Sequence, residues 1–144
     1  MYLSVTCAED VPFIDQGEAI RASAGNWFRN YRVEQQTRAC SMWPRGDIPE
    51  GYHLPVQSDV PTLILSGNLD PVTPPDLGEA VARTLPNSKQ IIVRHLAHMP
   101  DGVTNVHCLD NLMLKFLETA DPKNLDINCI DQVLPEPFVT APSK

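Results

Sequence analysis

Two polar side chains follow successive apolar runs of this sequence, and their chemistry suits acid–base catalysis. Asp70 comes shortly after the run at 62–65, and His98 lies just beyond a second run at 90–95. We expect both runs to be strands of an α/β sheet, and ligands and catalytic groups gather where such strands end. An acid after one strand and a histidine after the next follow the chain order of the second half of a Ser…Asp…His triad. In such a pair the carboxylate holds the tautomer of the imidazole and stabilises its cation.

Both residues also have a purely structural interpretation. Asp70 precedes Pro71, and Asp-Pro is a common turn dipeptide. His98 competes with His95, which ends the second apolar run, and with His107, which falls in the first turn of a predicted helix. A solvent-exposed histidine is the usual explanation for any of the three. We favour His98 because of its position on the loop beyond the strand.

The elements that must position this pair follow in the order strand, helix, strand, helix. Apolar runs predict strands near Thr62–Ser66 and Gln90–His95, the first of them covered on both faces. Between them we expect a helix near Thr73–Leu85, with Thr73 as its N-cap. A second amphipathic helix is expected near Asn105–Thr119. Because the links are short, the strands should pair in parallel with a right-handed crossover.

The rest of the chain predicts helices, an extended connection and a tail. Apolar spacing over Ile14–Tyr31 is typical of one or two short helices. The region ends with three aromatic side chains, Trp27, Phe28 and Tyr31. We expect them in the core, with the lining of a substrate pocket as the alternative. The 14 prolines cluster so as to predict an extended connection over Met42–Val60 and a surface tail over Leu134–Lys144.

Composition excludes several classes of partner. A length of 144 residues is enough for one domain with a core. The net charge of −7 argues against nucleic acid, and no apolar stretch approaches the roughly 20 residues of a membrane span. The first residues have neither a basic region nor a long apolar one, so we expect no signal peptide in this chain. No motif indicates a cofactor or a metal, and none is predicted.

The cysteine spacing by itself leaves the redox compartment open. There are four cysteines, at Cys7, Cys40, Cys108 and Cys129, and three pairings are possible. None of them has Cys-x-x-Cys spacing, so a zinc site is not favoured. Buried free thiols of a cytosolic protein and a pair of disulfides are equally compatible with the sequence.

The predicted strands suggest that the sequence is part of something larger, and its serines lack the context of a nucleophile. A parallel sheet of two strands does not form a stable domain by itself, so further strands must come from the N-terminal region or from elsewhere. No serine has glycine two residues before and two residues after it, the context of a nucleophile elbow. Ser23 comes nearest, and no strand precedes it.

Several motifs resemble those of a known family. The motif PTLILSGNLDPVTP at 61–74 resembles the C-terminal region of TAP-like α/β-hydrolases, relatives of bacterial tripeptidyl aminopeptidases and proline iminopeptidases. The likeness continues at 80–88, returns around Cys108 and Cys129, and is found upstream around Cys7 and Cys40. It covers about residues 3–133.

The resemblance implies a fold and an activity. The family has a mostly parallel α/β sheet with a serine on an elbow, an acid after the penultimate strand and a histidine after the last. Asp70 matches the acid and His98 matches the histidine, although Ala97 and Met99 stand where the family usually has glycine. The chain then resembles the C-terminal portion of a serine α/β-hydrolase, an aminopeptidase-like exopeptidase, with the nucleophile outside it. Its substrate would be a peptide or a small acyl compound, and a non-catalytic binding or structural module is the alternative.

The resemblance also implies an organisation and a compartment. It pairs Cys7 with Cys40 and Cys108 with Cys129, which implies an oxidising compartment and thus a secreted or periplasmic protein. We expect a TAP-like portion over 1–133, with a helical and extended lead-in at 1–60 and the strand and helix elements at 61–133. A proline-rich tail follows at 134–144. An incomplete sheet would leave an exposed strand edge through which the chain could self-associate.

Overall fold

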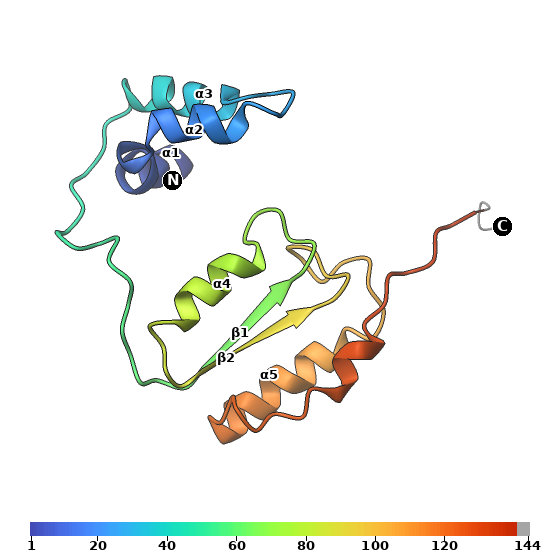
Figure 1. The fold of residues 1–144 in the computed structure, drawn as a ribbon. Helices are drawn as coiled ribbons and strands as arrows, with labels where there is room; N and C mark the ends of the chain where they lie inside the picture. The colour runs from blue at the N-terminus through green and yellow to red at the C-terminus, as the bar shows by residue number, and fades with distance from the viewer. Residues whose placement is uncertain (141–144) are drawn as a thin grey trace. The chain divides into compact units, whose positions relative to one another are not determined.

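A computed structural model describes residues 1–140 of the chain. The chain divides into two compact units, one of them Met1–Leu54 and the other running from Pro55 onward. Figure 1 shows that the regular elements of the first unit are helices, followed by a long segment without helix or strand, and that the second unit carries the strands. Within the described residues, no helix combines the length and the apolar composition needed to cross a bilayer.

The regular elements of the first unit are short helical segments. They are α1 (Tyr2–Val5), a π-helical turn (Thr6–Asp10), a 3₁₀ turn (Val11–Phe13), α2 (Gln16–Ser23) and α3 (Tyr31–Cys40). The side chain of Asp15 caps α2 by accepting a hydrogen bond from the backbone of Glu18 at 2.8 Å. Helix α2 lies in the region predicted to be helical, whereas α3 begins where that region ends.

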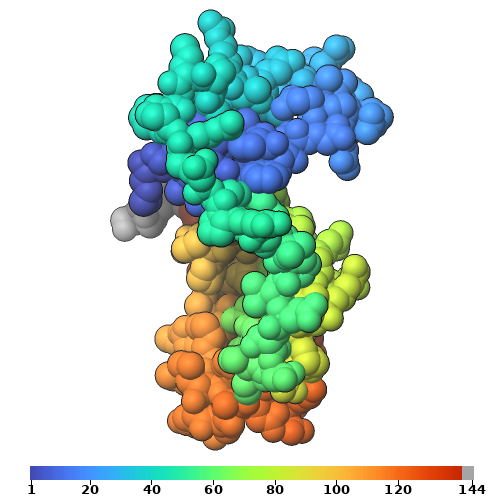
Figure 2. Space-filling view, turned by 90° about the vertical axis from the view of Figure 1, so that its left-hand side faces the viewer, coloured from blue at the N-terminus to red at the C-terminus, as the bar shows by residue number. Residues whose placement is uncertain are grey.

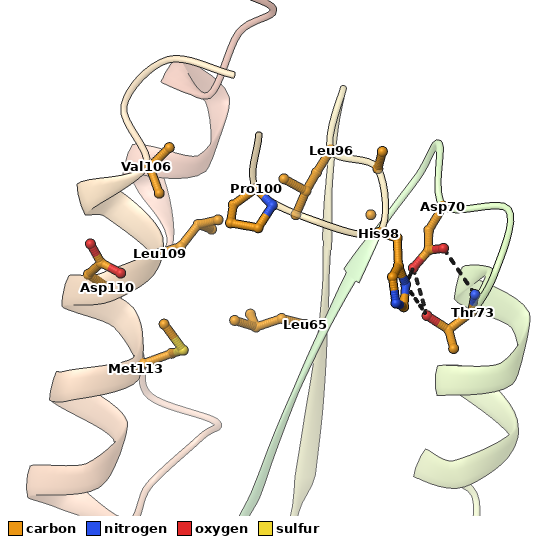
Figure 3. Close-up of a pocket in the computed structure, with 12 residues that line it drawn as sticks. Leu65, Asp70, Thr73, Leu96, His98, Pro100, Val106, Leu109, Asp110 and Met113 are labelled. Atoms are coloured by element: carbon orange, nitrogen blue, oxygen red, sulfur yellow. Dashed lines mark hydrogen bonds and ion pairs between the residues drawn. The ribbon is translucent and has the colours of Figure 1, made fainter. Parts of the chain in front are cut away.

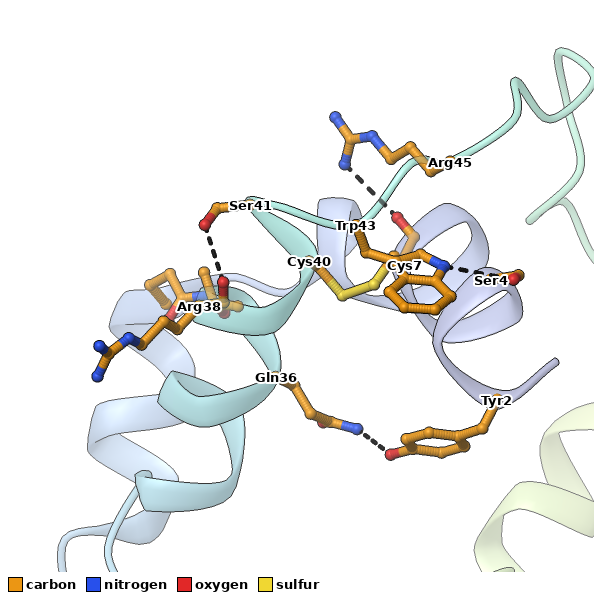
Figure 4. The surroundings of a disulfide bond; sticks show 11 residues. Tyr2, Ser4, Cys7, Gln36, Arg38, Cys40, Ser41, Trp43 and Arg45 are labelled. Atoms are coloured by element: carbon orange, nitrogen blue, oxygen red, sulfur yellow. Dashed lines mark hydrogen bonds between the residues drawn. A yellow bond between two sulfur atoms is a disulfide. The ribbon is translucent and has the colours of Figure 1, made fainter.

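A disulfide between Cys7 and Cys40 forms the centre of the first unit (Figure 4). Both cysteines are buried together with Val11, and their sulfur atoms are 1.97 Å apart. Nearby, the indole of Trp43 donates to the hydroxyl of Ser4 at 3.3 Å. The end of α3 is therefore held against the N-terminal turns by a covalent bond and by side-chain contacts around it.

The aromatic side chains of Trp27, Phe28 and Tyr31 do not lie in a core, so that expectation was wrong. Trp27 is 99% exposed, and Phe28 and Tyr31 are exposed as well. The physical reason is the small size of the unit. Its buried cluster consists of Cys7, Val11 and Cys40, and no second layer of the unit covers the turn that carries Trp27 and Phe28.

The second unit has the predicted order of elements. It consists of β1 (Thr62–Gly67), α4 (Pro75–Ala82), β2 (Ser88–Val93), α5 (His107–Thr119) and a 3₁₀ turn (Asn128–Gln132). Strands β1 and β2 pair in parallel, with Thr62 opposite Ser88 and Gly67 opposite Val93. The predicted α/β class with parallel strands, flanking helices and an incomplete sheet is confirmed.

Helices cover both faces of this sheet, α4 one face and α5 the other (Figure 1). On the face of α5, Ile91 and Val93 pack into the main apolar core. Its other buried members are Leu96, Val103, Cys108, Leu109, Leu112, Leu125, Ile130 and Val133. On the face of α4, the side-chain amide of Gln90 donates to the hydroxyl of Ser66 at 3.0 Å and to the carbonyl of Pro75 at 2.8 Å. Successive side chains of a strand point to opposite faces of the sheet. Ile91 and Val93 therefore make apolar contacts on one face, and Gln90 makes polar contacts on the other.

The start of the predicted tail is anchored. The carbonyl of Leu134 accepts hydrogen bonds from the backbone and the hydroxyl of Thr104, and Val103 forms an antiparallel bridge with Pro135. From Leu134 to residue 140 the side chains are exposed. The remainder of the predicted tail, 141–144, lies outside the described residues.

A second disulfide joins α5 to the turn after it, because the sulfur atoms of Cys108 and Cys129 are 2.01 Å apart. This bridge closes a loop over a sequence separation of 21. We expect the double variant Cys108→Ala/Cys129→Ala to lose about 3 kcal/mol of unfolding free energy, the loop-closure value for this length. Urea unfolding of the second unit measures the loss. Reduction of the wild-type chain should reproduce it, and unchanged midpoints in both cases would contradict a stabilising bridge.

Candidate functional site

Hydrogen bonds join the two loops that follow β1 and β2. The backbone N–H of Asn68 donates to the carbonyl of Val93 at 3.1 Å, and that of Leu69 donates to Leu96 at 3.0 Å. The side chain of Asn68 accepts from the N–H of His95 at 2.7 Å. His95 has a φ of +65°, a conformation uncommon for residues other than glycine. This clamp turns the chain after β2 back towards the end of β1.

The close approach of the two loops requires glycine at position 67. A Cβ atom at Gly67 would lie 2.3 Å from the carbonyl oxygen of Leu96 and 2.5 Å from that of Ala97. No side chain fits these distances, since the obstacles are backbone atoms. Sequence reasoning did not identify Gly67 or Asn68 as residues that position the site. Their only local signal was a Gly-Asn pair directly after an apolar run, which is typical of a turn.

The clamped loops bring Asp70 and His98 into contact (Figure 3). Nδ1 of His98 lies 3.0 Å from Oδ2 of Asp70. The side chain of Asp70 is 6% exposed and that of His98 is 48% exposed. Within residues 1–140, the hydrogen bonds of the His98 ring are made through Nδ1, so Nε2 is free to meet another group.

The Asp70 carboxylate accepts a full set of hydrogen bonds. Its Oδ1 accepts from the backbone N–H groups of Val72 at 2.8 Å and Thr73 at 3.0 Å. Its Oδ2 accepts from the hydroxyl of Thr73 at 2.6 Å, in addition to the contact with His98. An aspartate that binds backbone groups two and three residues ahead is a common turn arrangement, and Asp-x-x-Thr was its signal in the sequence.

Thr73 does not cap α4, so that prediction was wrong. The helix begins at Pro75 with Pro74 at the N-cap position, and no side chain caps it. The hydroxyl of Thr73 binds Asp70 instead. Because Pro75 lacks an N–H group, the helix start has one donor fewer that needs a cap.

Hydrogen bonding keeps Asp70 ionised. Burial raises the pKa of Asp70, but the hydrogen bonds from the hydroxyl and N–H of Thr73, from His98 and from the N–H of Val72 lower it by more. The net result is a pKa well below the ordinary value for an aspartate. A carboxylate is therefore present beside the imidazole at neutral pH.

This lowered pKa predicts a pH dependence of stability. The stabilisation from ionised Asp70 is complete above its unfolded value of 3.8 and is lost as pH falls below about 4 towards the lower folded value. We expect the unfolding free energy of the wild type to fall more steeply than that of Asp70→Asn between about pH 5 and pH 2. Urea unfolding at each pH measures both. Asp121, whose pKa is also lowered, chiefly by Asn124, contributes equally to the two curves, so parallel curves would contradict the role of Asp70.

The other two candidate histidines lie apart from the carboxylate. The side chain of His107 is 93% exposed, and its Nδ1 lies 3.6 Å from Oδ2 of Asp110 on the surface of α5. His95 contributes its backbone N–H to the clamp through Asn68. Of the three histidines weighed in the sequence, the structure thus brings His98 to Asp70.

An apolar cavity of about 360 Å³ lies beside the pair. Its apolar lining comes from β1, the loop after β2 and α5, and consists of Leu65, Leu96, Ala97, Pro100, Val106, Leu109 and Met113. Figure 3 shows Leu109 and Met113 of α5 facing Leu65 across this space, with His98 and Asp70 on the opposite side. The arrangement can hold an imidazole in one orientation next to an apolar wall.

The sequence profile of one family covers most of the chain. The family described as "TAP-like protein" matches residues 25–129, which include both strands, Asp70 and His98. The chain belongs to the TAP-like α/β-hydrolase family. The resemblance to TAP-like hydrolases noted in the sequence is therefore confirmed, and we refer to this protein below as the TAP-like chain.

A shorter segment is similar to known esterases. Over 51 residues, the TAP-like chain is 40% identical to proteins named pimeloyl-[acyl-carrier protein] methyl ester esterase from Neisseria meningitidis serogroup B and serogroup A. The match covers 35% of the TAP-like chain, 20% of the serogroup B relatives and 16% of the serogroup A relative. The chain thus spans about a fifth or less of the length of these relatives. No solved structure matches it significantly.

In the described part of the TAP-like chain, no cysteine thiol is free and no serine hydroxyl contacts His98. All four cysteines are in disulfides. Ser66 is buried, and its hydroxyl accepts from Gln90 on the face of α4. Among residues 1–140, no serine hydroxyl is hydrogen-bonded to His98.

Proposed function

We propose that this chain supplies the acid and the histidine of a Ser-Asp-His triad in a TAP-like serine hydrolase. Asp70 is the acid, His98 is the histidine, and the serine lies in a segment outside these 144 residues. The contact between Nδ1 of His98 and Oδ2 of Asp70 carries the proposal, because it leaves Nε2 available at the edge where two parallel strands end.

The geometry suits the known chemistry of such triads. Asp70 holds the imidazole with its proton on Nδ1, so Nε2 can take the proton of a serine hydroxyl as that serine attacks an acyl carbonyl. His98 then returns the proton to the leaving group. A water next attacks the acyl-enzyme through the same two proton transfers, which releases the acid and regenerates the serine. The oxyanion hole would come with the serine segment, since it is built beside the nucleophile.

We propose a peptide as substrate, cleaved near its N-terminus, and an ester as the second candidate. The family resemblance to aminopeptidases supports the first, and the similarity to methyl ester esterases supports the second. Both reactions transfer an acyl group through the same triad. They differ in the leaving group that His98 protonates, which is an amine for a peptide and methanol for a methyl ester.

The open edge of β1 is where we propose that the remaining sheet is added. Among residues 1–140, β1 pairs with β2 alone. Beside it lies an apolar groove of about 340 Å³ between β1 and α5, lined by Leu63, Leu65, Met113, Phe116 and Leu117. Figure 2 shows the orange surface of α5 and the turn after it next to the green segment that leads into β1. An unpaired strand edge next to apolar side chains is prone to pair with another strand.

Reconstitution tests the proposed function. This chain is combined with the polypeptide that holds a Gly-x-Ser-x-Gly serine, encoded upstream of Met1 or as a separate partner. Hydrolysis of aminoacyl and tripeptidyl anilides and of methyl esters is then measured. We expect activity and fluorophosphonate labelling of that serine in the combination and in neither part alone. A folded complex without either would favour a non-catalytic binding or structural module.

We expect the isolated chain to self-associate through the open edge of β1, and light scattering measures this association. Adding the serine-containing segment should suppress it. A monodisperse monomer would contradict the edge assignment.

We also propose that the protein works in a secreted or periplasmic compartment. Two disulfides within one short chain fit an oxidising environment, since cytosolic thiols are kept reduced. Titration of thiols without reductant in protein purified from its natural source tests this. Four free thiols would contradict the proposed compartment.

A further inference from the structure

Thr73 completes a triangle of polar atoms with the acid and the histidine. Its Oγ1 lies 2.6 Å from Oδ2 of Asp70 and 3.3 Å from Nδ1 of His98. The third side, from Oδ2 to Nδ1, measures 3.0 Å. Figure 3 shows the three side chains converging from the loops after β1 and β2.

The hydrogens available to this triangle allow one consistent arrangement. Asp70 is ionised and brings none, and the Thr73 hydroxyl has a single hydrogen. The short contact assigns that hydrogen to Oδ2 of Asp70. Nδ1 of His98 then faces a carboxylate oxygen and a hydroxyl oxygen whose hydrogen points elsewhere. A bare Nδ1 would meet electron pairs on both, whereas a protonated Nδ1 donates to Oδ2 with Oγ1 as a second acceptor.

We propose that Thr73 is a positioning residue, whose hydroxyl fixes Oδ2 of Asp70 opposite the ring, so that the carboxylate holds the proton of His98 on Nδ1 and leaves Nε2 bare. The inference rests on the proposed function for its catalytic meaning, because a bare Nε2 is what a serine needs as proton acceptor. Without the hydroxyl, Oδ2 has no partner besides the ring, so its contact with Nδ1 loosens and the half-exposed imidazole can turn and exchange its proton.

The surroundings of Thr73 keep its hydroxyl in place. Its backbone N–H is bound to Oδ1 of the same Asp70 carboxylate at 3.0 Å. Pro74 follows it and restricts its backbone to extended conformations. Its β-branched side chain has few rotamers. The hydroxyl is thus aimed at Asp70 by local geometry, which is the property that a positioning residue requires.

NMR on this chain as it stands tests the tautomer directly. At about pH 9, above the usual titration range of imidazole, the ¹⁵N shifts of the His98 ring report which nitrogen carries the proton. We expect the Nδ1–H form to dominate in the wild type and in Thr73→Ser. In Thr73→Val, which keeps the shape but lacks the hydroxyl, the Nε2–H fraction should rise several-fold.

Thr84→Val is the matched control, because the Thr84 hydroxyl donates to the carbonyl of Val81 within the same unit and not to the pair. Its His98 spectrum should match the wild type. If Thr73→Val does not fold, Thr73→Ala gives the same comparison. An unchanged tautomer in a folded variant without the hydroxyl would overturn the inference.

Kinetics of the reconstituted hydrolase give a second readout. Thr73→Val should lower kcat by about ten- to a hundredfold, the range for a misplaced catalytic group, with KM little changed, and Thr73→Ser should restore most of the rate. A variant whose tautomer shifts while kcat does not would limit Thr73 to a structural role and overturn the catalytic part of the inference. If the tautomer shifts in Thr73→Val but the wild-type assembly has no activity, the positioning of His98 by Thr73 stands. That result counts against the proposed function instead.

Discussion

Replacing Asp70 with asparagine is expected to lower the kcat of the reconstituted hydrolase by about 10⁴-fold, as the same change does in the serine-protease triad. The surroundings of Asp70 explain why the loss should be large. Two backbone N–H groups, from Val72 and Thr73, fix an acceptor at the position of Oδ1, so the oxygen of the asparagine amide must take that place. Its NH₂ group then faces His98 and favours a bare Nδ1. Nε2 would carry the proton and could not accept one from a serine.

Asp76→Asn provides the matched control for this prediction. Asp76 is an exposed acid in the first turn of α4, so it undergoes the same chemical change outside the pair. Steady-state kinetics on both variants should show a large loss of kcat for Asp70→Asn alone, with KM little affected. A loss of less than about tenfold would argue that Asp70 is only a turn residue.

Alanine at position 67 is expected to disrupt the fold around the site. The added Cβ would meet the carbonyl oxygens of Leu96 and Ala97 at 2.3 and 2.5 Å, so the loop that carries His98 has to move. We expect a loss of about 3 kcal/mol in unfolding free energy, the upper part of the usual range for overpacking. The tautomer signal of His98 should change with it, because Asp70 and His98 would separate.

Both tryptophans lie in the first unit, so unfolding of the second unit is best followed through its methyl resonances in urea. Gly46→Ala is the control, since a Cβ at Gly46 would have no atom within 4 Å. A Gly67→Ala chain as stable as the wild type, with the His98 signal unchanged, would show that the loop can yield without cost.

The strands could be predicted from local pattern, and their ends could not. Strand β2 begins at Ser88 and ends at Val93, two residues earlier at each end than the apolar run suggested. The parallel ladder extends to Ser88 because Thr62 of β1 is there to pair with it, whatever the polarity of the side chain. The strand ends before His95 because that residue adopts a left-handed turn, which Asn68 of the other loop stabilises.

The helix between the strands shows the same limit. The sequence predicted a helix near Thr73–Leu85, whereas α4 runs over Pro75–Ala82. Near the start of the helix, the Thr73 hydroxyl can either cap the helix or donate a hydrogen bond to Asp70, and it does the second. The carboxylate, held in place by the loop, is the stronger acceptor, since hydrogen bonds to charged groups are stronger than neutral ones.

The sequence by itself determined the family, the α/β class and the sheet edge at which Asp70 and His98 would lie. These follow from short-range order, because a residue just after a parallel strand must lie at its carboxyl end. Only the tertiary structure decided which histidine meets Asp70, which oxygen Thr73 binds, and that Trp27 stays exposed. The physical reason is that such contacts depend on the path of whole loops. That path is set by hydrogen bonds between distant residues, by the space left at Gly67 and by the layers available to cover a side chain.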